Sequence, residues 1–342
     1  PEVLGKDGCV RFRGAPALAF LERHVFRHGR QSFEAASVEE LERQISLHEA
    51  KDAAAEAEFA ARTIWHLVRD EKLRYREIAV ITGDMESFGD HMKKVLQEND
   101  IPCFYLGGGS NLLVSDFGIH GAVIYTGGFS DLSLLDGCVI ECGAGARLSK
   151  LCSFALENSL SGCEFAWGIP GTVGGAVYMN AGAYGGEMKD VILSVRHMTP
   201  DGEIEEVPAE SLKLGYRSSV YSKNKNIILS AKLKLHPGDK NEIREKMDDL
   251  IERRKEKQPI DMPSAGSTFK RPEGNFAGTL IEQCGLKGAS VGGAMVSEKH
   301  AGFIVNTGDA TCSEVLRLIE KVRDTVLEKS GVLLEPEVRV IK

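Results

Sequence analysis

The spacing of hydrophobic and polar positions changes near residue 100. Before it, Lys51–Arg69 is rich in Ala and Glu and carries apolar residues at helical spacing, so we expect a helix there. The β-branched run Glu77–Thr82, a Gly-Asp turn and the stretch Glu86–Glu98 predict a strand followed by a helix. From Ile101 onward the chain is Gly-rich with short apolar runs, which indicates a mixed fold of strands and helices.

The remainder of the chain alternates short strands with two long helices. Three β-branched runs predict strands, namely Ala122–Tyr125, Cys138–Glu141 and Ile227–Leu235. Lys240–Lys257 and Cys312–Ser330 have charged, amphipathic patterns and predict helices. The two prolines of Gln258–Ser264 predict a loop, and Val332–Ile341 has the pattern of a strand.

Charge and cysteine content limit the class of protein. The formal net charge of −8 argues against broad binding to nucleic acid or to an anionic membrane. None of the eight cysteines forms a CxxC pair, so we expect free thiols in a reducing cytosol and no metal site. We see no secretory signal and no apolar run that could cross a bilayer. We therefore expect a cytoplasmic, monomeric protein without membrane or nucleic-acid partners.

Two Gly-rich segments are the first candidates for chemistry. Leu106–Val114 (LGGGSNLLV) has three consecutive glycines, whose missing side chains allow backbone N–H groups to surround a pyrophosphate. Gly168–Glu187 has seven glycines in twenty residues, which suggests a backbone lying against a large planar ligand. Each segment alone is also compatible with tight turns. Neither matches GxGxxG or GxxxxGK[ST], so the usual dinucleotide and P-loop interpretations fail.

Three further motifs are ordinary when taken singly. Gly215–Ser219 (GYRSS) places an Arg after a Tyr, and Ala265–Pro272 (AGSTFKRP) places a Ser after a Gly in a loop. Leu334–Arg339 (LEPEVR) has two glutamates that flank a proline. The order and spacing of all five motifs are the informative feature.

From about residue 99 to 342, these motifs together resemble the UDP-N-acetylenolpyruvoylglucosamine reductase (MurB) family. The resemblance implies an α+β protein with an FAD-binding domain of the vanillyl-alcohol-oxidase (PCMH) type, followed by an α+β substrate-binding domain. It implies that NADPH reduces non-covalently bound FAD and that the reduced cofactor then reduces the enolpyruvyl ether of a UDP-amino sugar. The product is UDP-N-acetylmuramate, for peptidoglycan synthesis. A different flavoenzyme on the same fold is an alternative, against which the AGSTFKRP and LEPEVR motifs weigh.

The resemblance also assigns roles to individual residues. Arg217 stabilises the charge that develops on the substrate carboxylate, and Glu337, whose pKa should be raised, assists it. Ser267 donates the proton to C2. The expected FAD-binding residues are Gly107, Gly108, Gly109, Ser110, Asn111, Ile169, Pro170, Gly171, Thr172, Asn180, Ala181, Gly182 and Arg339. The expected substrate-binding residues are Tyr184, Lys257, Lys270, Arg271 and His300.

Residues 11–104 do not have the pattern of that family and resemble an internal piece of the AddB subunit of the bacterial helicase–nuclease. We therefore expect an apparent chimera with an AddB-like segment over 1–76, an FAD-binding domain over 77–225 and a C-terminal domain over 226–342. In this arrangement the AddB-like part supplies the strand, helix and strand before the LGGGSN loop. The alternatives are an interaction module of a DNA-repair complex and an inactive chimera, and an absorbance spectrum of bound flavin distinguishes them from the reductase.

Overall fold

A computed structural model of the chain describes residues 48–71, 73, 78, 95 and 102–341. The chain divides into two compact units, Pro1–Glu56 and Ala57–Lys342. Helix α3, Ala53–Arg69, confirms the helix expected over Lys51–Arg69, and it buries Ala57, Ala61 and Ile64 along one face. The strand predicted over Glu77–Thr82 and the helix predicted over Glu86–Glu98 lie outside the described residues. None of the described helices has the length and apolar character that crossing a membrane requires.

A short pair of parallel strands flanks the first Gly-rich loop. Strand β1 (Cys103–Leu106) pairs with β3 (Ala122–Tyr125), with Cys103 opposite Ala122. The first three residues after β1 are Gly107–Gly109, so the strand delivers the glycines to its carboxyl end. The AVIY strand prediction is confirmed.

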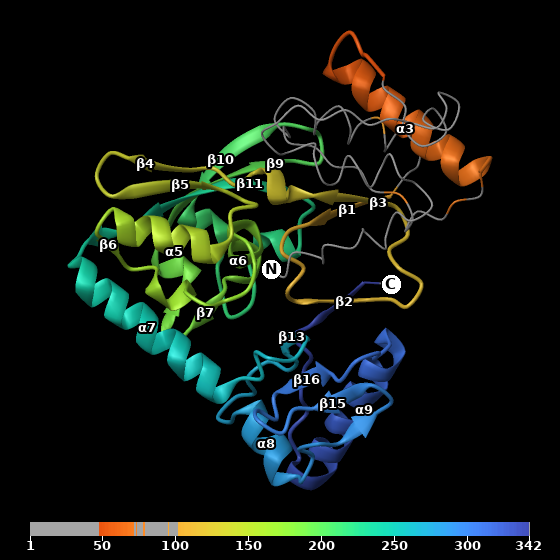
Figure 1. The fold of residues 1–342 in the computed structure, drawn as a ribbon, viewed down its shortest axis with the longest axis vertical. Coiled ribbons are helices and arrows are strands. Elements are labelled where there is room, and N and C mark those ends of the chain that lie inside the picture. The colour runs from red at the N-terminus through yellow and green to blue at the C-terminus, as the bar shows by residue number, and fades with distance from the viewer. Residues whose placement is uncertain (1–47, 72, 74–77, 79–94, 96–101, 342) are drawn as a thin grey trace, which may run out of the picture. The chain divides into compact units, whose positions relative to one another are not determined.

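A five-stranded antiparallel sheet forms the centre of the FAD-domain region. Its strand order is β10-β9-β11-β5-β4. The strands are β4 (Leu132–Leu135), β5 (Val139–Gly143), β9 (Ile192–Met198), β10 (Ile204–Pro208) and β11 (Ile227–Lys234). Helix α6 (Val173–Met179) packs on β11, and α5 (Leu148–Glu157) packs against α7 (Lys240–Lys257), as Figure 1 shows. The α7 bounds agree with the sequence prediction.

The main core lies between this sheet and its helices. Ile140, Leu151, Val195 and Leu233 are at most 1% exposed, because alternate strand positions and one face of each helix turn toward each other. Short hairpins and pairs complete the region, namely β6 (Leu160–Ser161) with β12 (His236–Pro237) and β7 (Gly182–Ala183) with β8 (Gly186–Glu187).

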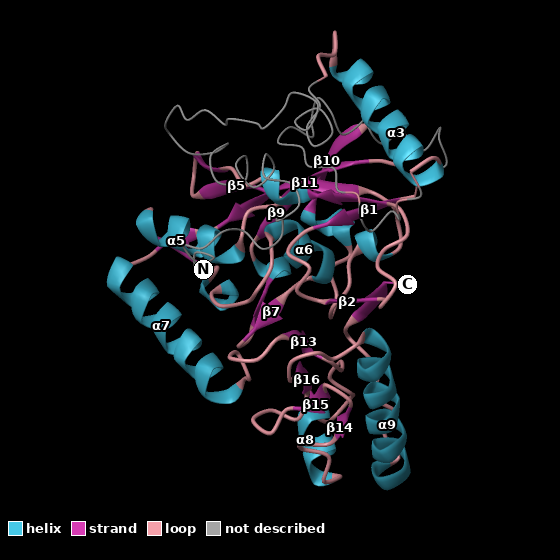
Figure 2. Ribbon diagram, turned by 45° about the vertical axis from the view of Figure 1, so that its right-hand side comes forward, coloured by secondary structure: helices cyan, strands magenta, loops and turns pink. Residues whose placement is uncertain are grey.

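A smaller four-stranded antiparallel sheet organises the C-terminal region, with the strand order β13-β16-β15-β14. Its strands are β13 (Ser264–Ser267), β14 (Ser290–Val291), β15 (Ala294–Val296) and β16 (Phe303–Asn306). Helix α9 (Cys312–Ser330) packs on β14 and β15 and against α8 (Ala277–Gln283), as Figure 2 shows. A second core containing Ile281, Leu318 and Val322 fills the space between them.

The last strand returns to the beginning of the FAD-domain region. Strand β17 (Arg339–Ile341) pairs in parallel with β2 (Leu112–Val114), with Arg339 opposite Leu112. The strand predicted over Val332–Ile341 is therefore too long. Its first part has no regular pairing, because Pro336 interrupts it and only an isolated bridge joins Pro336 to Phe269.

The cysteine prediction holds for the residues that the structure describes. All seven cysteines other than Cys9, which lies outside them, are free thiols. Cys142, Cys152 and Cys163 are at most 2% exposed. Burial is the main reason why the pKa of the Cys142 thiol is raised. This thiol therefore stays protonated and behaves as a small apolar side chain.

Candidate active site

One large cavity collects most of the residues that the sequence singled out. Its volume is about 1240 Å³, above the roughly 300–1,000 Å³ of ordinary small-molecule pockets. Such a volume suits an extended ligand or two ligands together. The predicted site residues that line it are Gly107, Gly108, Gly109, Ser110, Asn111, Ile169, Pro170, Gly171, Thr172, Ala181, Gly182, Arg217, Ser267, Glu337 and Arg339.

The two Gly-rich segments pack directly on one another. A Cβ on Gly107 would lie 2.7 Å from Thr172 Oγ1, and a Cβ on Gly108 would lie 2.9 Å from the Cα of Gly171. Ser110 Oγ also donates a hydrogen bond of 2.8 Å to the Pro170 carbonyl. Gly107 and Gly108 are therefore required for the two loops to pack together. The sequence had suggested only that these glycines let the backbone approach a pyrophosphate.

The first loop presents a row of unused backbone donors to the cavity. Within the described residues, none of the N–H groups from Gly107 to Asn111 donates to a protein acceptor. The N–H groups near the start of α6 differ, since Gly174 donates to the Ala144 carbonyl and Gly175 to Thr172 Oγ1. Consecutive N–H groups without acceptors form a concave site for an anion such as a pyrophosphate.

Arg217 and Glu337 come from segments 120 residues apart and meet in the cavity. Arg217 Nε donates to Glu337 Oε1 at 2.7 Å, and its Nη2 donates to the Gly182 carbonyl at 3.3 Å. Arg217 has a left-handed backbone with φ of 52°, in a tight turn that joins Gly215 and Ser218. Within the described residues, Nη1 has no acceptor, so the guanidinium keeps a donor for a further carboxylate.

The environment of Glu337 has the predicted electrostatic character. Burial raises the pKa of this carboxyl, while the charge and the hydrogen bond of Arg217 act in the opposite direction. Its backbone is held from two sides, since its N–H donates to Thr268 at 2.8 Å and its carbonyl accepts from Asn111 Nδ2 at 3.3 Å. The raised pKa agrees with the expectation for an acid that assists catalysis.

Ser267 reaches the cavity from the end of β13. The strand pairs with β16, with Ser267 opposite Phe303, and Gly266 before it has φ of 83°. This left-handed position favours a glycine and turns the following serine toward the cavity. The Ser267 hydroxyl donates to the Phe269 carbonyl at 3.1 Å, so it must rotate away from this acceptor to donate elsewhere.

Arg339 also faces the cavity. Its guanidinium hydrogen bonds to the Tyr178 hydroxyl and lies 4.7 Å from the centre of that ring. The β17–β2 pairing fixes its backbone, because its N–H donates to the Asn111 carbonyl at 3.0 Å.

Six predicted site residues do not line this cavity. The side chain of Asn180 is consumed by the fold, since its Nδ2 donates to Glu187 and to the Gly215 carbonyl and its Oδ1 accepts from the Lys189 N–H. Asn180 is 1% exposed and ends α6 in a left-handed conformation. Its side chain therefore supports the turn that carries Gly182.

The predicted substrate-binding residues lie near the cavity rather than in its wall. Lys270 pairs with Glu335 at 3.0 Å, and the Arg271 guanidinium lies 4.0 Å from the centre of the Phe276 ring. His300 Nδ1 accepts from the Gly302 N–H, and burial lowers its pKa, so it is a neutral, packed side chain. Tyr184 is 44% exposed, and Lys257 is exposed at the end of α7.

Two cations in the cavity wall were not expected from the sequence, the exposed Lys225 and the buried Arg254. Arg254 on α7 is 8% exposed, its Nη1 donates to Gln258, and its buried Nε has no acceptor within the described residues. Its guanidinium also lies 5.7 Å from the centre of the Tyr184 ring. Burial lowers the pKa of this group, although an arginine stays charged. The available signal was its spacing, because Arg254 continues the buried positions Ile243, Met247 and Leu250.

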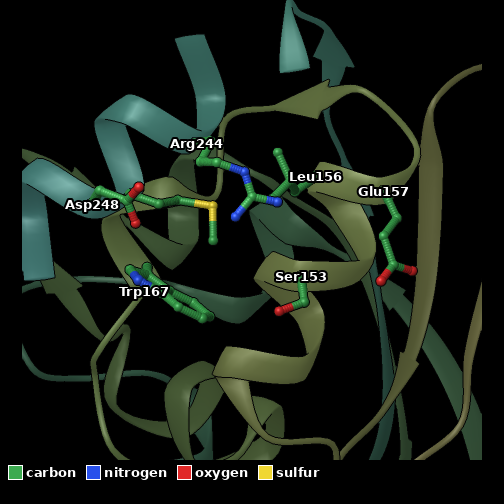
Figure 3. A pocket seen from close by; sticks show the side chains of 7 residues that line it. Ser153, Leu156, Glu157, Trp167, Arg244 and Asp248 are labelled. Carbon is green, nitrogen blue, oxygen red and sulfur yellow. The ribbon is translucent and has the colours of Figure 1, made fainter. Parts of the chain in front are cut away.

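A second, smaller cavity carries none of the predicted site residues. Its volume is about 140 Å³, and Figure 3 shows Ser153, Leu156 and Glu157 of α5 facing Arg244 and Asp248 of α7 beside Trp167. This cavity lies within the packing of two helices and has no part in the site described above.

Comparisons with known proteins agree with this geometry. The family model for an FAD binding domain matches residues 90–208, and that for the C-terminal domain of UDP-N-acetylenolpyruvoylglucosamine reductase matches residues 258–341. The reductase of Lachnoclostridium phytofermentans is 52% identical over 266 residues, covering 77% of this chain and 86% of that protein. The chain belongs to the UDP-N-acetylenolpyruvoylglucosamine reductase family.

Other members of the reductase family support the assignment. The enzyme of Agathobacter rectalis is 52% identical over 294 residues, covering 80% of this chain and 94% of that protein. The crystal structure of the MurB reductase from Thermus caldophilus superimposes with a TM-score of 0.64 at 40% identity, over 73% of this chain and 90% of that chain. The predicted α+β architecture, an FAD-binding domain followed by the C-terminal domain of this family, is thus confirmed.

The start of the FAD-binding match corrects one boundary. It begins at residue 90, upstream of Asn99, where the motifs placed the start of the reductase resemblance. Residues 90–104 were also included in the AddB-like segment, and they belong to the FAD-domain match. The reductase match reaches still further upstream, because the Agathobacter rectalis enzyme aligns with 80% of this chain, which is more than residues 90–342 contain. These comparisons give no support to the AddB resemblance.

The contact between the two Gly-rich loops predicts that a larger side chain at Gly108 weakens flavin binding. We expect Gly108→Ala to reduce the flavin content of the purified protein strongly, because its Cβ would lie 2.9 Å from a backbone atom of Gly171 that cannot move independently. Such overpacking costs about 1–3 kcal/mol. The control is Gly185→Ala, where a Cβ meets no atom within 4 Å but the φ of 90° strains the backbone, so this variant is destabilised without disturbing the contact between the loops. Equal flavin-to-protein ratios in both variants would contradict the role of loop contact.

The raised pKa of Glu337 predicts a pH dependence of stability. The unfolded chain ionises this group near 4.5, whereas the folded chain holds the proton to higher pH because of burial. The free energy of unfolding therefore falls as pH rises from 4.5 through the raised pKa, and the loss is complete above it. Glu337→Gln lacks this contribution. Urea unfolding from pH 4.5 to about 8 should show the stability of the wild type falling relative to the variant. If the wild type instead became more stable relative to Glu337→Gln as the pH rises, the pKa of Glu337 would be lowered and the prediction would be wrong.

Proposed function

We propose that this chain is an NADPH-dependent, FAD-containing reductase that converts UDP-N-acetylglucosamine enolpyruvate to UDP-N-acetylmuramate. The observation that carries the proposal is the convergence of Arg217, Ser267 and Glu337 on one cavity, beside a loop with unused backbone donors. These residues come from three separate motifs of the chain. Membership of the reductase family supports the same substrate and reaction.

The cavity residues fit FAD. The N–H groups of Gly107–Asn111 suit its pyrophosphate, and the backbone of Ile169–Thr172 with Ala181 and Gly182 offers a side-chain-poor wall for a planar ring. Arg339, held against Tyr178, supplies a cation at the same cavity. When bound, FAD supplies the carrier that takes a hydride from NADPH and delivers it to C3 of the enolpyruvyl group.

Arg217, Glu337 and Ser267 act on the substrate. Hydride addition at C3 places negative charge on C2 and the adjoining carboxylate, and the free donor of Arg217 stabilises that charge. Glu337 orients the guanidinium through the 2.7 Å bond, and burial favours its protonated form as charge develops. Ser267 then transfers its hydroxyl proton to C2, after which the serine oxygen regains a proton from solvent or a neighbouring acid.

The diphosphate and sugar of the substrate require cations and hydrogen-bond donors. Arg254 has a buried, unsatisfied Nε in the cavity wall, and Tyr184 lies beside it. We assign this pair to the anionic part of the substrate. Lys257, Lys270 and Arg271 lie outside the wall and would reach the substrate from the rim, whereas the packing of His300 favours support of Phe303 by ring contact at 5.0 Å.

The proposed organisation has three parts. We assign residues 77–225, together with β11 and α7, to the FAD-binding domain, because β11 lies inside its sheet and α7 packs on α5. The boundary expected at residue 225 therefore moves to the end of α7, and the residues after it form the substrate-binding domain of a monomeric, cytoplasmic enzyme. Residues 1–76 are the part that we assign to the AddB-like sequence. Removing residues 1–42 and measuring flavin retention tests whether that part contributes to the fold.

The function is tested by turnover of the purified chain. We expect NADPH oxidation that depends on UDP-N-acetylglucosamine enolpyruvate, with formation of UDP-N-acetylmuramate in equal amount. An absorbance spectrum of oxidised flavin should accompany it. A flavin-containing protein that oxidises NADPH without consuming this substrate would overturn the substrate assignment.

Flavin binding should be non-covalent. The two Gly-rich segments contain no His or Cys to which a flavin could be attached. Precipitation with trichloroacetic acid should therefore leave all yellow colour in the supernatant. Colour retained in the protein pellet would refute this prediction.

A further inference from the structure

Asp116 joins the FAD-domain region to the start of helix α9. It lies in the loop after β2, and its Oδ1 accepts from the Cys312 N–H at 2.5 Å. Its Oδ2 accepts from the Ser313 N–H at 3.0 Å and from the Ser313 hydroxyl at 2.6 Å. Bonds between residues so far apart in sequence set the position of one domain on the other.

These bonds complete the cap of α9. Within the helix, Thr311 accepts from the Glu314 N–H, and the Glu314 carboxylate accepts from the Thr311 N–H. The N–H groups of Cys312 and Ser313 are left over, as the first N–H groups of every helix are. Asp116 supplies their acceptors from outside the C-terminal domain. The Ser313 hydroxyl and the two N–H groups lower the pKa of Asp116, in that order, so the carboxylate is ionised at the positive end of the helix.

Strand β2 is therefore attached to the C-terminal domain at both ends. At its start, Asn111 Nδ2 donates to the Glu337 carbonyl and the Asn111 carbonyl accepts from the Arg339 N–H. Past its end, Ser115 donates to the Ile341 carbonyl and Asp116 holds α9. One attachment is at the candidate catalytic acid itself. The other is at the helix on which the rest of the domain packs.

Helix α9 is connected to the candidate catalytic residues by hydrogen bonds. Arg323 Nε on α9 donates to the Leu334 carbonyl at 3.0 Å, and Leu334 is fully buried. Three residues further on, the backbone is joined to the segment after Ser267, because the Glu337 N–H donates to the Thr268 carbonyl at 2.8 Å. A rotation of α9 would thus shift both Ser267 and Glu337 relative to Arg217, which belongs to the FAD-domain region.

We propose that Asp116 is a positioning residue, which holds α9 so that Ser267 stands in reach of the substrate carbon that Arg217 faces. This inference rests on the proposed function. Proton transfer tolerates little displacement, and a shift on the order of 1 Å costs about a hundredfold in rate. Reduction of the flavin by NADPH needs no proton from Ser267.

The test compares Asp116→Ala and Asp116→Asn with the wild-type holoenzyme. Stopped-flow absorbance follows flavin reduction by NADPH and then re-oxidation by saturating UDP-N-acetylglucosamine enolpyruvate. In Asp116→Ala we expect re-oxidation to slow about tenfold or more, with a larger solvent deuterium isotope effect, while flavin reduction changes less than about twofold. Asp116→Asn keeps an acceptor oxygen, so its re-oxidation rate should lie between those of the wild type and of Asp116→Ala.

Asp239→Ala is the matched control. Asp239 also caps a helix, accepting from the Asn241 and Glu242 N–H groups of α7, and both of these bonds stay within the segment before residue 258, where the C-terminal domain match begins. The Asp239→Ala substitution should lower the free energy of unfolding without changing the solvent isotope effect on re-oxidation. If Asp116→Ala fails to fold, Ser313→Ala removes the 2.6 Å bond alone and should slow re-oxidation about threefold.

The outcomes separate the two proposals. A wild-type protein that does not reduce the substrate overturns the proposed function. An active wild type with Asp116 variants whose half-reactions and isotope effects match those of Asp239→Ala overturns the positioning role.

Discussion

Replacing Ser267 by alanine should slow reduction of the substrate by about 10²–10⁴-fold, the usual contribution of a positioned acid. The Ser267 hydroxyl lines the cavity, and within the described residues its hydrogen bond is to the Phe269 carbonyl, so its removal leaves no large packing defect. Flavin reduction by NADPH should stay near the wild-type rate. Stopped-flow measurement of the two half-reactions separates the effects.

The matched control for Ser267→Ala is Ser290→Ala. Ser290 is exposed, lies on β14 of the same sheet and does not line the cavity. This variant should leave both half-reactions unchanged. Equal slowing of flavin reduction and substrate reduction by Ser267→Ala would instead indicate that Ser267 supports the structure of the site.

Arg217→Lys should lower the rate of substrate reduction by about 10²–10³-fold, although the charge is kept. The arginine holds Glu337 and the Gly182 carbonyl with different nitrogens and keeps Nη1 for the substrate. A lysine has one nitrogen and cannot make these bonds together with the geometry of a planar fork. Single-turnover re-oxidation at saturating substrate measures the loss.

Arg253→Lys is the comparison for Arg217→Lys. Arg253 pairs with Asp249 at 2.9 Å on the exposed side of α7, with side chains 56% and 50% exposed. An exposed pair of this kind contributes about 0.5 kcal/mol, and its loss should leave the kinetics unchanged. If Arg217→Lys retained full activity, a single positive charge would suffice, and the proposed fork geometry would be wrong.

Local pattern predicted the long helices with bounds close to the observed ones, but it did not predict the shorter helices α5, α6 and α8. The helix over Lys240–Lys257 agrees with α7 because Asp239 caps its start and apolar side chains recur along one face. The helix over Cys312–Ser330 agrees with α9, which starts with a capping box and ends at Gly331 in a left-handed conformation. These signals are short-range, so the sequence contains them without knowledge of the fold.

Long-range contacts could not be predicted in this way. The strand expected over Val332–Ile341 shortens to three residues, because its pairing partner β2 lies more than 200 residues earlier and only three positions meet it. Arg254 appeared to be one charge among many on a polar helix, and its burial follows from the packing of α7 beside the cavity. The hydrogen bonds that occupy the Asn180 side chain also join segments distant in sequence, so the sequence did not reveal them.

The sequence by itself determined the long helices α3, α7 and α9, the Gly-rich loops and, through the order of the motifs, which residue types form the site. Only the tertiary structure decided which glycines are needed for loop contact, that Arg217 pairs with Glu337, and that Asp116 holds α9. The physical reason is the range of the interactions. Periodicity and capping act within a few residues of the chain, whereas burial, desolvation and ion pairing depend on which distant segments the fold brings into contact.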